Sequence, residues 1–345
     1  MKVAVLTGGG DCPGLNAVIR AVVRRGTEHG FEMMGLRDGW KGLLEENHFR
    51  LTRETTSGIL HRGGTILGTS RTNPFKVENG LERVKRAVER NGIGAIIAIG
   101  GEGTLSATTR MHQEGLRVVG VPKTIDNDIS ATDFTFGFDT AVMIATDAID
   151  RLHSTAESHK RVIVCEVMGR HVGWIATYAG IAGGADVILV PEIPADLNRV
   201  AEHIKRRHAG GRTFSIVVVA EGTRVKAESD QAEHLVTSGA LDEAGRPRLG
   251  GVGQLVAEQI EKRTGFETRV SVLGHIQRGG APTAHDRVLA TRYGVHACDM
   301  VQRGEWGKMA ALHGNDIVSV DLALATKELK RVPEEFFRVA QVFFG

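Results

Sequence analysis

The chain has 345 residues, which is enough for two domains whose cores need no disulfide or metal to stabilise them. Charged residues make up 24% and apolar residues 41%, so the composition excludes a disordered chain and a coiled coil. The formal net charge is only +2 and no run of Lys and Arg forms a basic stripe, which argues against nucleic acid as the partner.

Cysteine use and the first residues indicate the compartment. The three cysteines are widely spaced and form no Cys-x-x-Cys pair, which fits a reducing cytoplasm. The chain starts with a short apolar strand followed at once by glycines, without the basic region and longer apolar segment of a signal peptide. We find no membrane span either, and we expect a cytoplasmic protein.

Short apolar runs alternate with helical patterns along the chain. Strands are expected at 2–7, 94–99, 117–121, 161–167, 186–190, 214–220 and 268–274. A helix is expected after Gly14, where apolar residues repeat at helical spacing: Leu15, Val18, Ile19, Val22 and Val23. Another helix spans about 80–91, with Gly92 as its C-terminal cap. This alternation predicts an α/β fold with mostly parallel sheets.

The stretch 222–250 loses the alternation. It is rich in charged residues, so we expect an exposed excursion there. No clear linker divides the chain, which predicts two lobes that exchange strands or helices instead of two independent domains.

Two glycine-rich turns follow predicted strands. The first, at 8–14, opens a helix, where free backbone N–H groups and the positive helix end favour an anion. Pro13 breaks the dinucleotide spacing Gly-x-Gly-x-x-Gly, and neither this turn nor the second, at 100–104, ends in the Gly-Lys-Ser/Thr of a P-loop. Each turn alone is also compatible with an ordinary strand-to-helix connection.

A segment with two carboxylates follows the next predicted strand. It reads Pro-Lys-Thr-Ile-Asp-Asn-Asp at 122–128. Because the carboxyl ends of parallel strands meet at one edge of a sheet, this segment and the glycine turns should lie side by side. With Glu102, the carboxylates Asp126 and Asp128 supply hard ligands for Mg²⁺ and a base. Alone the segment is equally an Asx-turn, but the combination predicts phosphoryl transfer to a hydroxyl.

Basic residues gather at other predicted strand ends. They are Arg71, Arg161, Arg170, Arg269, His275 and Arg278. A single arginine is most often solvated, but the planar guanidinium group matches phosphate with two hydrogen bonds. Several arginines beside glycines, in a chain with so little net charge, indicate phosphate-bearing ligands.

In these segments the sequence resembles the 6-phosphofructokinases, which phosphorylate the 1-hydroxyl of fructose 6-phosphate. The matching segments span most of the chain in the family's order: 7–16, 63–65, 100–104, 122–128, 167–170, 191–192 and 273–280. The resemblance implies two Rossmann-like, three-layer α/β lobes intertwined by exchange of strands and helices. A donor lobe would comprise 1–137 and about 277–327, and a fructose 6-phosphate lobe would comprise 138–276 and about 328–345.

The resemblance also implies residue roles. Asp126 would accept the hydroxyl proton, and Thr124, Asp128 and Arg170 would complete the catalytic set. Glu102, where many relatives carry Asp, would lie near Mg²⁺. The donor phosphates would be held by Gly10, Arg71, Thr72, Gly101, Glu102, Gly103 and Thr104. The sugar phosphate would be held by Thr124, Ile125, Asp126, Arg161, Met168, Gly169, Arg170, Glu221, Arg269, His275 and Arg278. Arg161 and Arg269 would come from a neighbouring subunit of a homotetramer.

Two residues indicate different donors. Among relatives, glycine at position 103 goes with ATP, since a side chain there would block the α-phosphate, whereas lysine at position 123 is typical of pyrophosphate users. We give more weight to Gly103, because steric exclusion is a stronger constraint than a flexible lysine. We therefore expect an ATP-dependent 6-phosphofructokinase of glycolysis that uses Mg²⁺, with pyrophosphate as the alternative donor.

Other functions remain open. A non-catalytic sugar-phosphate-binding regulatory subunit would have no use for a base such as Asp126, and an oxidoreductase is suggested only by the first turn and Glu32. A related sugar phosphate fits the same arginines. The resemblance further implies an allosteric effector site for a nucleotide diphosphate or phosphoenolpyruvate, with residues at Arg20, Arg24, Arg53, Asp186 and Arg212. His153 and Asp186 stand where relatives carry arginine and glutamate. These positions are therefore equally compatible with an effector site and with ordinary charged residues on helix surfaces.

Overall fold

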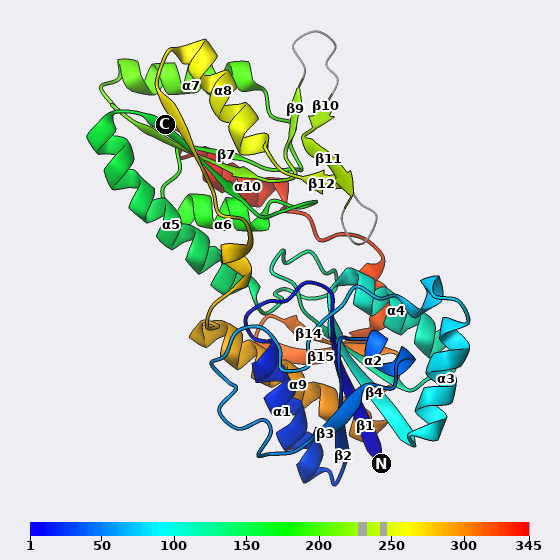
Figure 1. Cartoon of the computed structure of the whole chain (residues 1–345). Coiled ribbons are helices and arrows are strands. Elements are labelled where there is room, and N and C mark those ends of the chain that lie inside the picture. Colours follow the sequence, from blue (N-terminus) through cyan, green and yellow to red (C-terminus); the bar gives the residue numbers. More distant parts are fainter. Residues whose placement is uncertain (227–232, 242–246, 345) are drawn as a thin grey trace. The chain divides into compact units, whose positions relative to one another are not determined.

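The computed structural model describes residues 1–226, 233–241 and 247–344. The chain divides into two compact units, Met1–Thr140 with Arg278–Leu329 and Ala141–Gln277 with Lys330–Gly345. Each unit is therefore assembled from two separate stretches of chain, which Figure 1 shows by colour. The expected α/β fold with two lobes that exchange segments is confirmed.

The first unit is built on a seven-stranded sheet in the order β15-β14-β5-β4-β1-β2-β3. Its strands are β1 (Lys2–Gly8), β2 (Glu32–Leu36), β3 (His48–Leu51), β4 (Ile93–Gly100), β5 (Val118–Pro122), β14 (Lys308–His313) and β15 (Asp316–Asp321). The five inner strands are parallel, and the edge strands β3 and β15 are antiparallel to their neighbours.

Helices cover both faces of this sheet (Figure 1). They are α1 (Leu15–Glu28), α2 (Lys41–Leu44), α3 (Gly80–Arg90), α4 (Glu102–Gln113) and α9 (Ala284–Arg303), with short 3-10 turns at Pro74–Lys76 and Leu322–Thr326. Ala4 and Leu6 of β1 belong to the core formed with α3 and α4, while the alternate residues Val3 and Val5 are equally buried. A strand that is buried on both faces has to be apolar throughout, which explains the continuous apolar runs in the sequence.

The second unit has a four-stranded parallel sheet in the order β13-β6-β8-β7. Its strands are β6 (Val162–Val167), β7 (Val187–Leu189), β8 (Ser215–Ala220) and β13 (Thr268–Val272). Its helices are α6 (Trp174–Ala182), α7 (Leu197–Ala209), α8 (Val252–Thr264) and α10 (Glu334–Gln341), and α5 (Phe138–His159) runs into it from the first unit. A 3-10 turn at Gly274–Arg278 follows β13.

All seven predicted strands are confirmed, with ends that differ by at most two residues. The helix after Gly14 is also confirmed, and its five apolar residues are buried. Gly92 follows the predicted second helix with φ at 63°, the left-handed conformation that a glycine adopts readily at a helix end. Strands β2, β3, β14 and β15 of the first unit were not among the seven predicted strands.

Part of the predicted excursion at 222–250 forms two small antiparallel sheets. One pairs β9 (Arg224–Lys226) with β10 (Glu233–Leu235), and the other pairs β11 (Thr237–Leu241) with β12 (Pro247–Leu249). Residues 227–232 and 242–246 of this stretch lie outside the described residues, so its expected exposure is not tested there.

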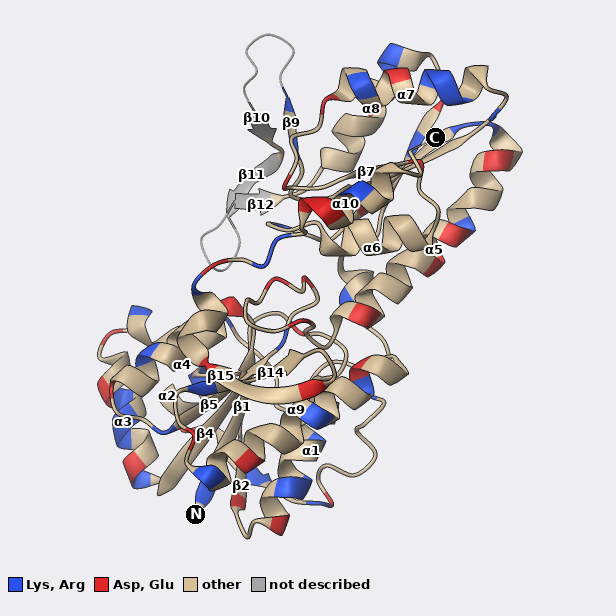
Figure 2. Ribbon diagram, turned by 180° about the vertical axis from the view of Figure 1, so that it is seen from behind, with Lys and Arg blue, Asp and Glu red and all other residues tan. Residues whose placement is uncertain are grey.

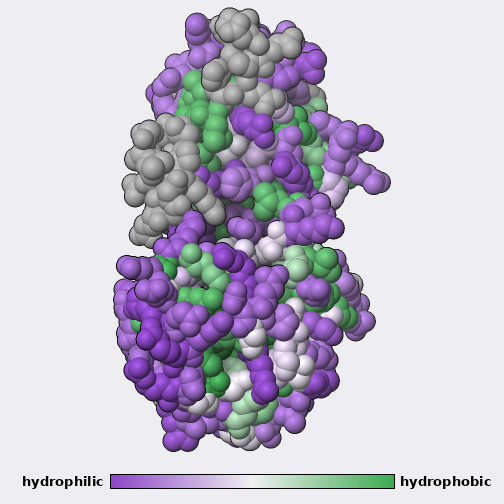
Figure 3. Space-filling model, turned by 90° about the vertical axis from the view of Figure 1, so that its right-hand side faces the viewer, coloured by the Kyte–Doolittle hydropathy of each residue, from purple (hydrophilic) through white to green (hydrophobic). Residues whose placement is uncertain are grey.

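Basic and acidic residues are interspersed along the helices of each unit (Figure 2), in line with the balanced charge of the sequence. In the view of Figure 3, hydrophilic residues cover most of the larger unit, with smaller apolar patches between them. In the described part of the chain, every helix is too short or too polar to cross a lipid bilayer.

Candidate functional site

The first unit brings the two glycine turns and the carboxylate segment to one edge of its sheet. Gly8 of β1 pairs with Gly100 of β4, and Gly100 pairs with Pro122 of β5. The three parallel strands therefore end in the same row, and the loops that follow them emerge side by side. This confirms the arrangement that the sequence predicts from strand direction.

The loop after β1, residues 8–14 and here called the donor loop, is joined to segment 68–72. The Gly9 amide donates to the Ser70 carbonyl at 2.9 Å, and the Thr69 hydroxyl donates to the Gly9 carbonyl at 2.6 Å. Arg71 and Thr72 follow directly in this segment, so the structure places both beside the donor loop. The sequence did not identify Thr69 and Ser70 as the residues that make this connection.

The N-terminus of α4 lies next to the donor loop. A Cβ atom at Gly8 would lie 2.5 Å from Thr104 Oγ1, so only glycine allows β1 and α4 to approach this closely. Gly101 caps the helix without a side-chain hydrogen bond, which leaves its first N–H groups to a ligand. Glu102 and Gly103 are exposed there, and a Cβ atom at Gly103 would meet nothing within 4 Å.

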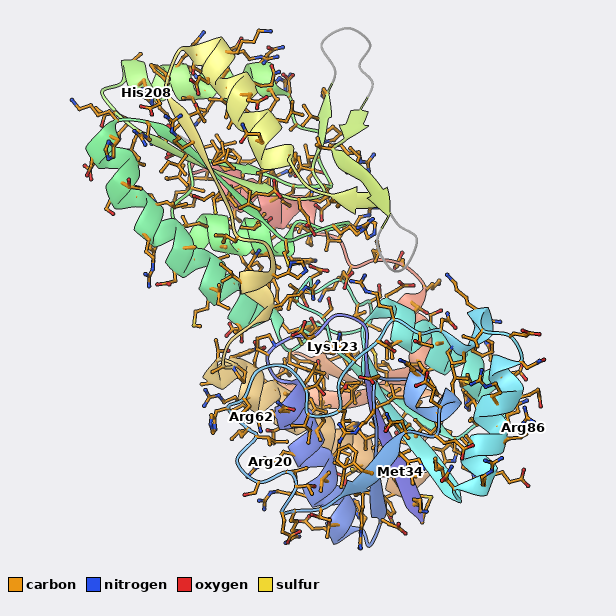
Figure 4. The ribbon with its side chains drawn as sticks, in the orientation of Figure 1. Arg20, Met34, Arg62, Arg86, Lys123 and His208 are labelled. Carbon is orange, nitrogen blue, oxygen red and sulfur yellow. The ribbon has the colours of Figure 1, made fainter. Side chains whose placement is uncertain are left out.

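Lys123 is buried in this site, with 3% of its surface exposed. Its ammonium group donates to the Gly10 carbonyl, and its backbone amide donates to the Gly100 carbonyl at 2.9 Å. Figure 4 shows Lys123 at the edge of the sheet where β1 and β4 end. Burial lowers the pKa of Lys123, and the positive charge of Arg278 acts in the same direction. The lysine is therefore held between the two glycine turns, where the sequence suggested a flexible side chain.

The carboxylates lie close enough to affect one another. The Asp126 amide donates a hydrogen bond to Thr124 Oγ1 at 3.0 Å, which closes a tight local turn. Burial raises the pKa of Asp128 to about 7, and the negative charges of Asp126 and Glu102 add to this effect. Burial and neighbouring negative charge thus disfavour the ionised form of Asp128, and a bound divalent cation or a proton would offset this effect.

Arg278 contacts the donor loop. Its Nη1 donates to the Asp11 carbonyl at 3.2 Å, and a Cβ atom at Gly10 would lie 2.7 Å from the same nitrogen. The sequence placed Arg278 among the residues for the sugar phosphate. Its contact with the donor loop is an additional relationship that spacing did not reveal.

In the second unit, Met168, Gly169 and Arg170 follow β6, and Glu221 follows the neighbouring strand β8. The Glu221 amide donates to the Val167 carbonyl at 2.9 Å, and the Gly222 amide donates to the Gly169 carbonyl at 3.0 Å. The structure therefore brings these expected sugar-binding residues together at the carboxyl edge of the sheet. His275, in the turn after β13, is exposed at the same edge.

Arg161 and Arg269 lie elsewhere in this unit. Arg161 directly precedes β6, Arg269 is the second residue of β13, and both pair with Glu267 Oε1, at 3.1 Å and 2.5 Å. A strand of this length spans about 17–20 Å. The two arginines therefore lie at the opposite edge of the sheet from Arg170. A single chain does not bring Arg161 and Arg269 together with Arg170.

Asp186, one of the five residues expected at the effector site, and His153 make contacts within the chain. Asp186 is buried, pairs with Arg207 at 2.6 Å and accepts a hydrogen bond from the Ile216 amide at 2.8 Å. His153 hydrogen-bonds the Gly183 carbonyl at 2.6 Å. The sequence did not predict Arg207 as the partner of Asp186, because the two belong to different elements of the fold.

Comparison with known proteins agrees with this geometry. The family model described as Phosphofructokinase matches residues 2–301. The chain is 57% identical over 347 residues to the pyrophosphate–fructose 6-phosphate 1-phosphotransferase of Amycolatopsis methanolica, covering 100% of both chains. It is 53% identical over 342 residues to the ATP-dependent 6-phosphofructokinase 3 of Streptomyces coelicolor, covering 99% of both. The phosphofructokinase structure from Saccharomyces cerevisiae matches with a TM-score of 0.81 and 32% identity, covering 99% of this chain and 46% of that chain.

With this α/β fold, the family match and the relatives place the chain among the phosphotransferases that act on a hydroxyl group. The chain belongs to the phosphofructokinase family. The resemblance found in the sequence is confirmed.

Proposed function

We propose that the protein is an ATP-dependent 6-phosphofructokinase, which converts fructose 6-phosphate and ATP to fructose 1,6-bisphosphate and ADP. The observation that carries this proposal is the alignment of Gly8, Gly100 and Pro122 in one row. A donor phosphate and a base would therefore lie at the same edge of the sheet. Phosphoryl transfer depends mainly on such alignment and on neutralising the charge of the moving group.

The catalytic roles follow from position. Asp126 would accept the proton of the 1-hydroxyl, with Thr124 fixing its turn, and Ile125 and Asp128 completing the loop. The N–H groups of the donor loop and of the α4 N-terminus, around Gly10, Gly101 and Thr104, would hold the donor phosphates. Arg71 and Thr72 would lie beside them, and Arg170 would stabilise the charge of the group in transit.

The residues present fit Mg²⁺. Burial raises the pKa of Asp128, the negative charges of Asp126 and Glu102 add to this effect, and a bound cation would offset both. Mg²⁺ uses one or two carboxylates together with substrate phosphates and needs no protein cage. Accordingly, the described residues contain no group of three His, Cys, Asp or Glu side chains arranged around a metal. Glu102 and Asp128 would hold the ion, which would neutralise charge on the donor phosphates.

The sugar phosphate would use mainly residues of the second unit. Met168, Gly169, Arg170 and Glu221 would contact the sugar, and His275 would contact its 6-phosphate together with Arg278, which belongs to the first unit. Arg161 and Arg269 would complete the clamp from a neighbouring subunit of a homotetramer. Their location at the other edge of the sheet from Arg170 supports this assignment, because a single chain cannot use both sets on one ligand.

The choice of ATP rests on Gly103. The position is exposed at the start of α4, and a Cβ atom there would meet nothing within 4 Å. The space beside the phosphate turn is thus kept open by the absence of a side chain. A donor that extends beyond two phosphates needs such space, and relatives named ATP-dependent 6-phosphofructokinase share 51–53% of residues with this chain.

Pyrophosphate is the second candidate donor, and a specific observation favours it. The Lys123 ammonium group is buried against the Gly10 carbonyl, which puts a positive charge among the phosphate turns. A small, highly charged donor would gain most from that charge. Relatives named for pyrophosphate are also 56–57% identical to this chain.

The deciding experiment measures initial rates of fructose 1,6-bisphosphate formation with Mg²⁺ and either ATP or pyrophosphate, in parallel. The Asp126→Asn variant, purified in the same way, controls for contaminating kinases. We expect activity with ATP that the variant lacks. Activity with pyrophosphate alone would reject ATP as the donor, and no activity with either donor would reject the proposed function.

Regulation and location complete the proposal. We expect a cytoplasmic enzyme that phosphoenolpyruvate inhibits through the effector site that the resemblance implies. Saturation curves for fructose 6-phosphate, with and without phosphoenolpyruvate, test this expectation. Unchanged curves would count against a working effector site, in which case the pair of Asp186 with Arg207 would serve the fold alone.

A further inference from the structure

After the carboxylate segment 122–128, from here on called the carboxylate loop, the chain returns to lie beside it before α5 begins. Lys123 and Phe136 form a parallel β-bridge, so residues 135–137, here called the return segment, run beside the start of the carboxylate loop in the same direction. Nothing in the sequence motifs drew attention to this segment. All of it belongs to the first unit, together with the donor loop.

Two hydrogen bonds of Thr135 connect the return segment to the carboxylate loop. Its hydroxyl donates to the Thr124 carbonyl at 2.8 Å, and its amide donates to Asn127 Oδ1 at 3.1 Å. Asn127 stands between Asp126 and Asp128 and has φ at 51°, a left-handed conformation that asparagine tolerates better than most residues. Asn127 and Thr135 are each only 1% exposed, so water cannot replace these bonds readily.

The same segment is packed against the donor loop. A Cβ atom at Gly14 would lie 2.7 Å from the Phe136 ring, and one at Gly137 would lie 2.7 Å from Cys12 Sγ. The Cys12 thiol also donates to the Phe136 carbonyl at 3.7 Å. Glycine at these two positions thus lets the donor loop and the return segment touch directly.

The return segment rests on a rigid support. The Phe136 ring is fully buried and lies 6.4 Å from the ring of Tyr293 on α9. The Tyr293 hydroxyl donates to the Phe134 carbonyl at 2.6 Å and hydrogen-bonds Thr132 at 2.8 Å. A segment held in this way by ring packing and hydrogen bonds has little freedom to shift.

We propose that Thr135, Phe136 and Asn127 are positioning residues, which together set the distance between the donor loop and Asp126. Thr135 and Asn127 hold the loop of the base, Phe136 holds the donor loop, and one short segment carries both contacts. This inference rests on the proposed function, since a distance between base and donor matters only if a phosphoryl group is transferred there. Misplacement of reacting groups by about 1 Å can cost about 100-fold in rate.

The test is Thr135→Val, which keeps the shape of the side chain and removes the bond to the Thr124 carbonyl. We expect kcat to fall by about 10-fold to 100-fold, with KM for fructose 6-phosphate and for the donor within about threefold of the wild-type values. Thr135→Ser retains the hydroxyl and should restore most of kcat. The matched control is Thr56→Val, because Thr56 is equally buried and its hydroxyl donates to the Thr52 carbonyl at the same distance of 2.8 Å.

A second variant, Asn127→Gly, removes the acceptor and keeps a residue suited to positive φ. If Thr135 and Asn127 act through the same connection between the two segments, the double variant should lose less activity than the product of the two single losses. Unchanged kcat in Thr135→Val and Asn127→Gly, in an active enzyme, would overturn this inference alone. A wild-type enzyme without activity on either donor would overturn the proposed function and this inference with it. Equal losses in Thr56→Val would also overturn it, since the effect would then be general destabilisation.

Discussion

The Lys123 ammonium group donates a hydrogen bond to the Gly10 carbonyl, so a buried side chain of the carboxylate loop reaches into the donor loop. The same residue is joined through its backbone amide to Gly100, at the end of the neighbouring strand. Lys123 therefore touches both glycine turns. It is placed where the phosphates of a donor would bind, and its role depends on which donor the enzyme uses.

Lys123→Met should separate the two donors. The change keeps the length of the side chain and removes the charge and the bond to Gly10. Since a hydrogen bond to a charged group contributes about 1.5–3 kcal/mol, we expect kcat/KM for pyrophosphate to fall about 10-fold or more. With ATP we expect a fall below about fivefold. Steady-state kinetics with both donors check this, and an equal loss with ATP and pyrophosphate would contradict the distinction.

Gly103→Asp should act on the opposite donor. The added side chain would occupy the open space at the start of α4 and bring a negative charge near the phosphates. We expect KM for ATP to rise by at least about 10-fold, as one lost or repelled charged contact implies, while fructose 6-phosphate affinity stays the same. Gln113→Asp adds the same charge at the exposed far end of α4 and serves as the control. Unchanged KM for ATP would show that Gly103 does not decide donor access.

Asp126→Asn should abolish proton acceptance without changing the shape of the loop. General base catalysis typically contributes about 10²-fold to 10⁴-fold, so we expect kcat to fall within that range. KM for fructose 6-phosphate should change little, because the arginines that bind the phosphate are untouched. A variant that retains near-full kcat would remove Asp126 from the role of base.

The pH dependence of stability should report on Asp128. Its pKa is raised from 3.8 to about 7, mainly by burial and next by Asp126. A carboxyl with a raised pKa in the folded state favours folding while it is protonated, and this contribution is lost as pH rises through about 7. We therefore expect Asp128→Asn to gain stability relative to the wild type between pH 5 and pH 8, measured by urea unfolding with EDTA present. A difference that stays constant over this range would show that Asp128 has an ordinary pKa.

Shared sites between subunits predict complementation. If Arg161 acts in a neighbour's site, oligomers that mix Arg161→Ala chains with Asp126→Asn chains contain some sites with both wild-type residues. Co-expression with different affinity tags should then recover activity that neither variant has alone. Mixing Asp126→Asn with Asp128→Asn gives the control, because both residues come from the same loop of one chain. Recovery in the control pair, or none in the test pair, would contradict a shared site.

Several features of the site could be predicted because they depend on short stretches of sequence. The apolar strands before Gly8, Gly100 and Pro122 and the periodic helix after Gly14 define βα units, and parallel strands necessarily end at one edge. Strand β14 escaped prediction because its apolar run, Met-Ala-Ala-Leu, has no β-branched or aromatic residue, and β15 escaped because it is only half-buried, so its apolar pattern is weak.

Contacts between loops could not be predicted in this way. The partners of Lys123 and Asp186 are distant in sequence, at Gly10 and Arg207, and they meet only once strand order and register are set. Likewise, the sequence grouped Arg161 and Arg269 with Arg170 as basic residues near strand ends. Only the direction of each strand in the folded sheet separates the amino edge from the carboxyl edge.

The sequence by itself thus determined the fold class and the family, and it predicted which turns bind phosphate and which residue is the base, because periodicity, turn chemistry and motif order are local properties. The tertiary structure decided how these parts are held relative to one another within each unit. It buried Lys123 in the donor loop, raised the pKa of Asp128 and placed the return segment between two loops. Burial and mutual charge are properties of the packed neighbourhood, and no single segment of the chain carries them.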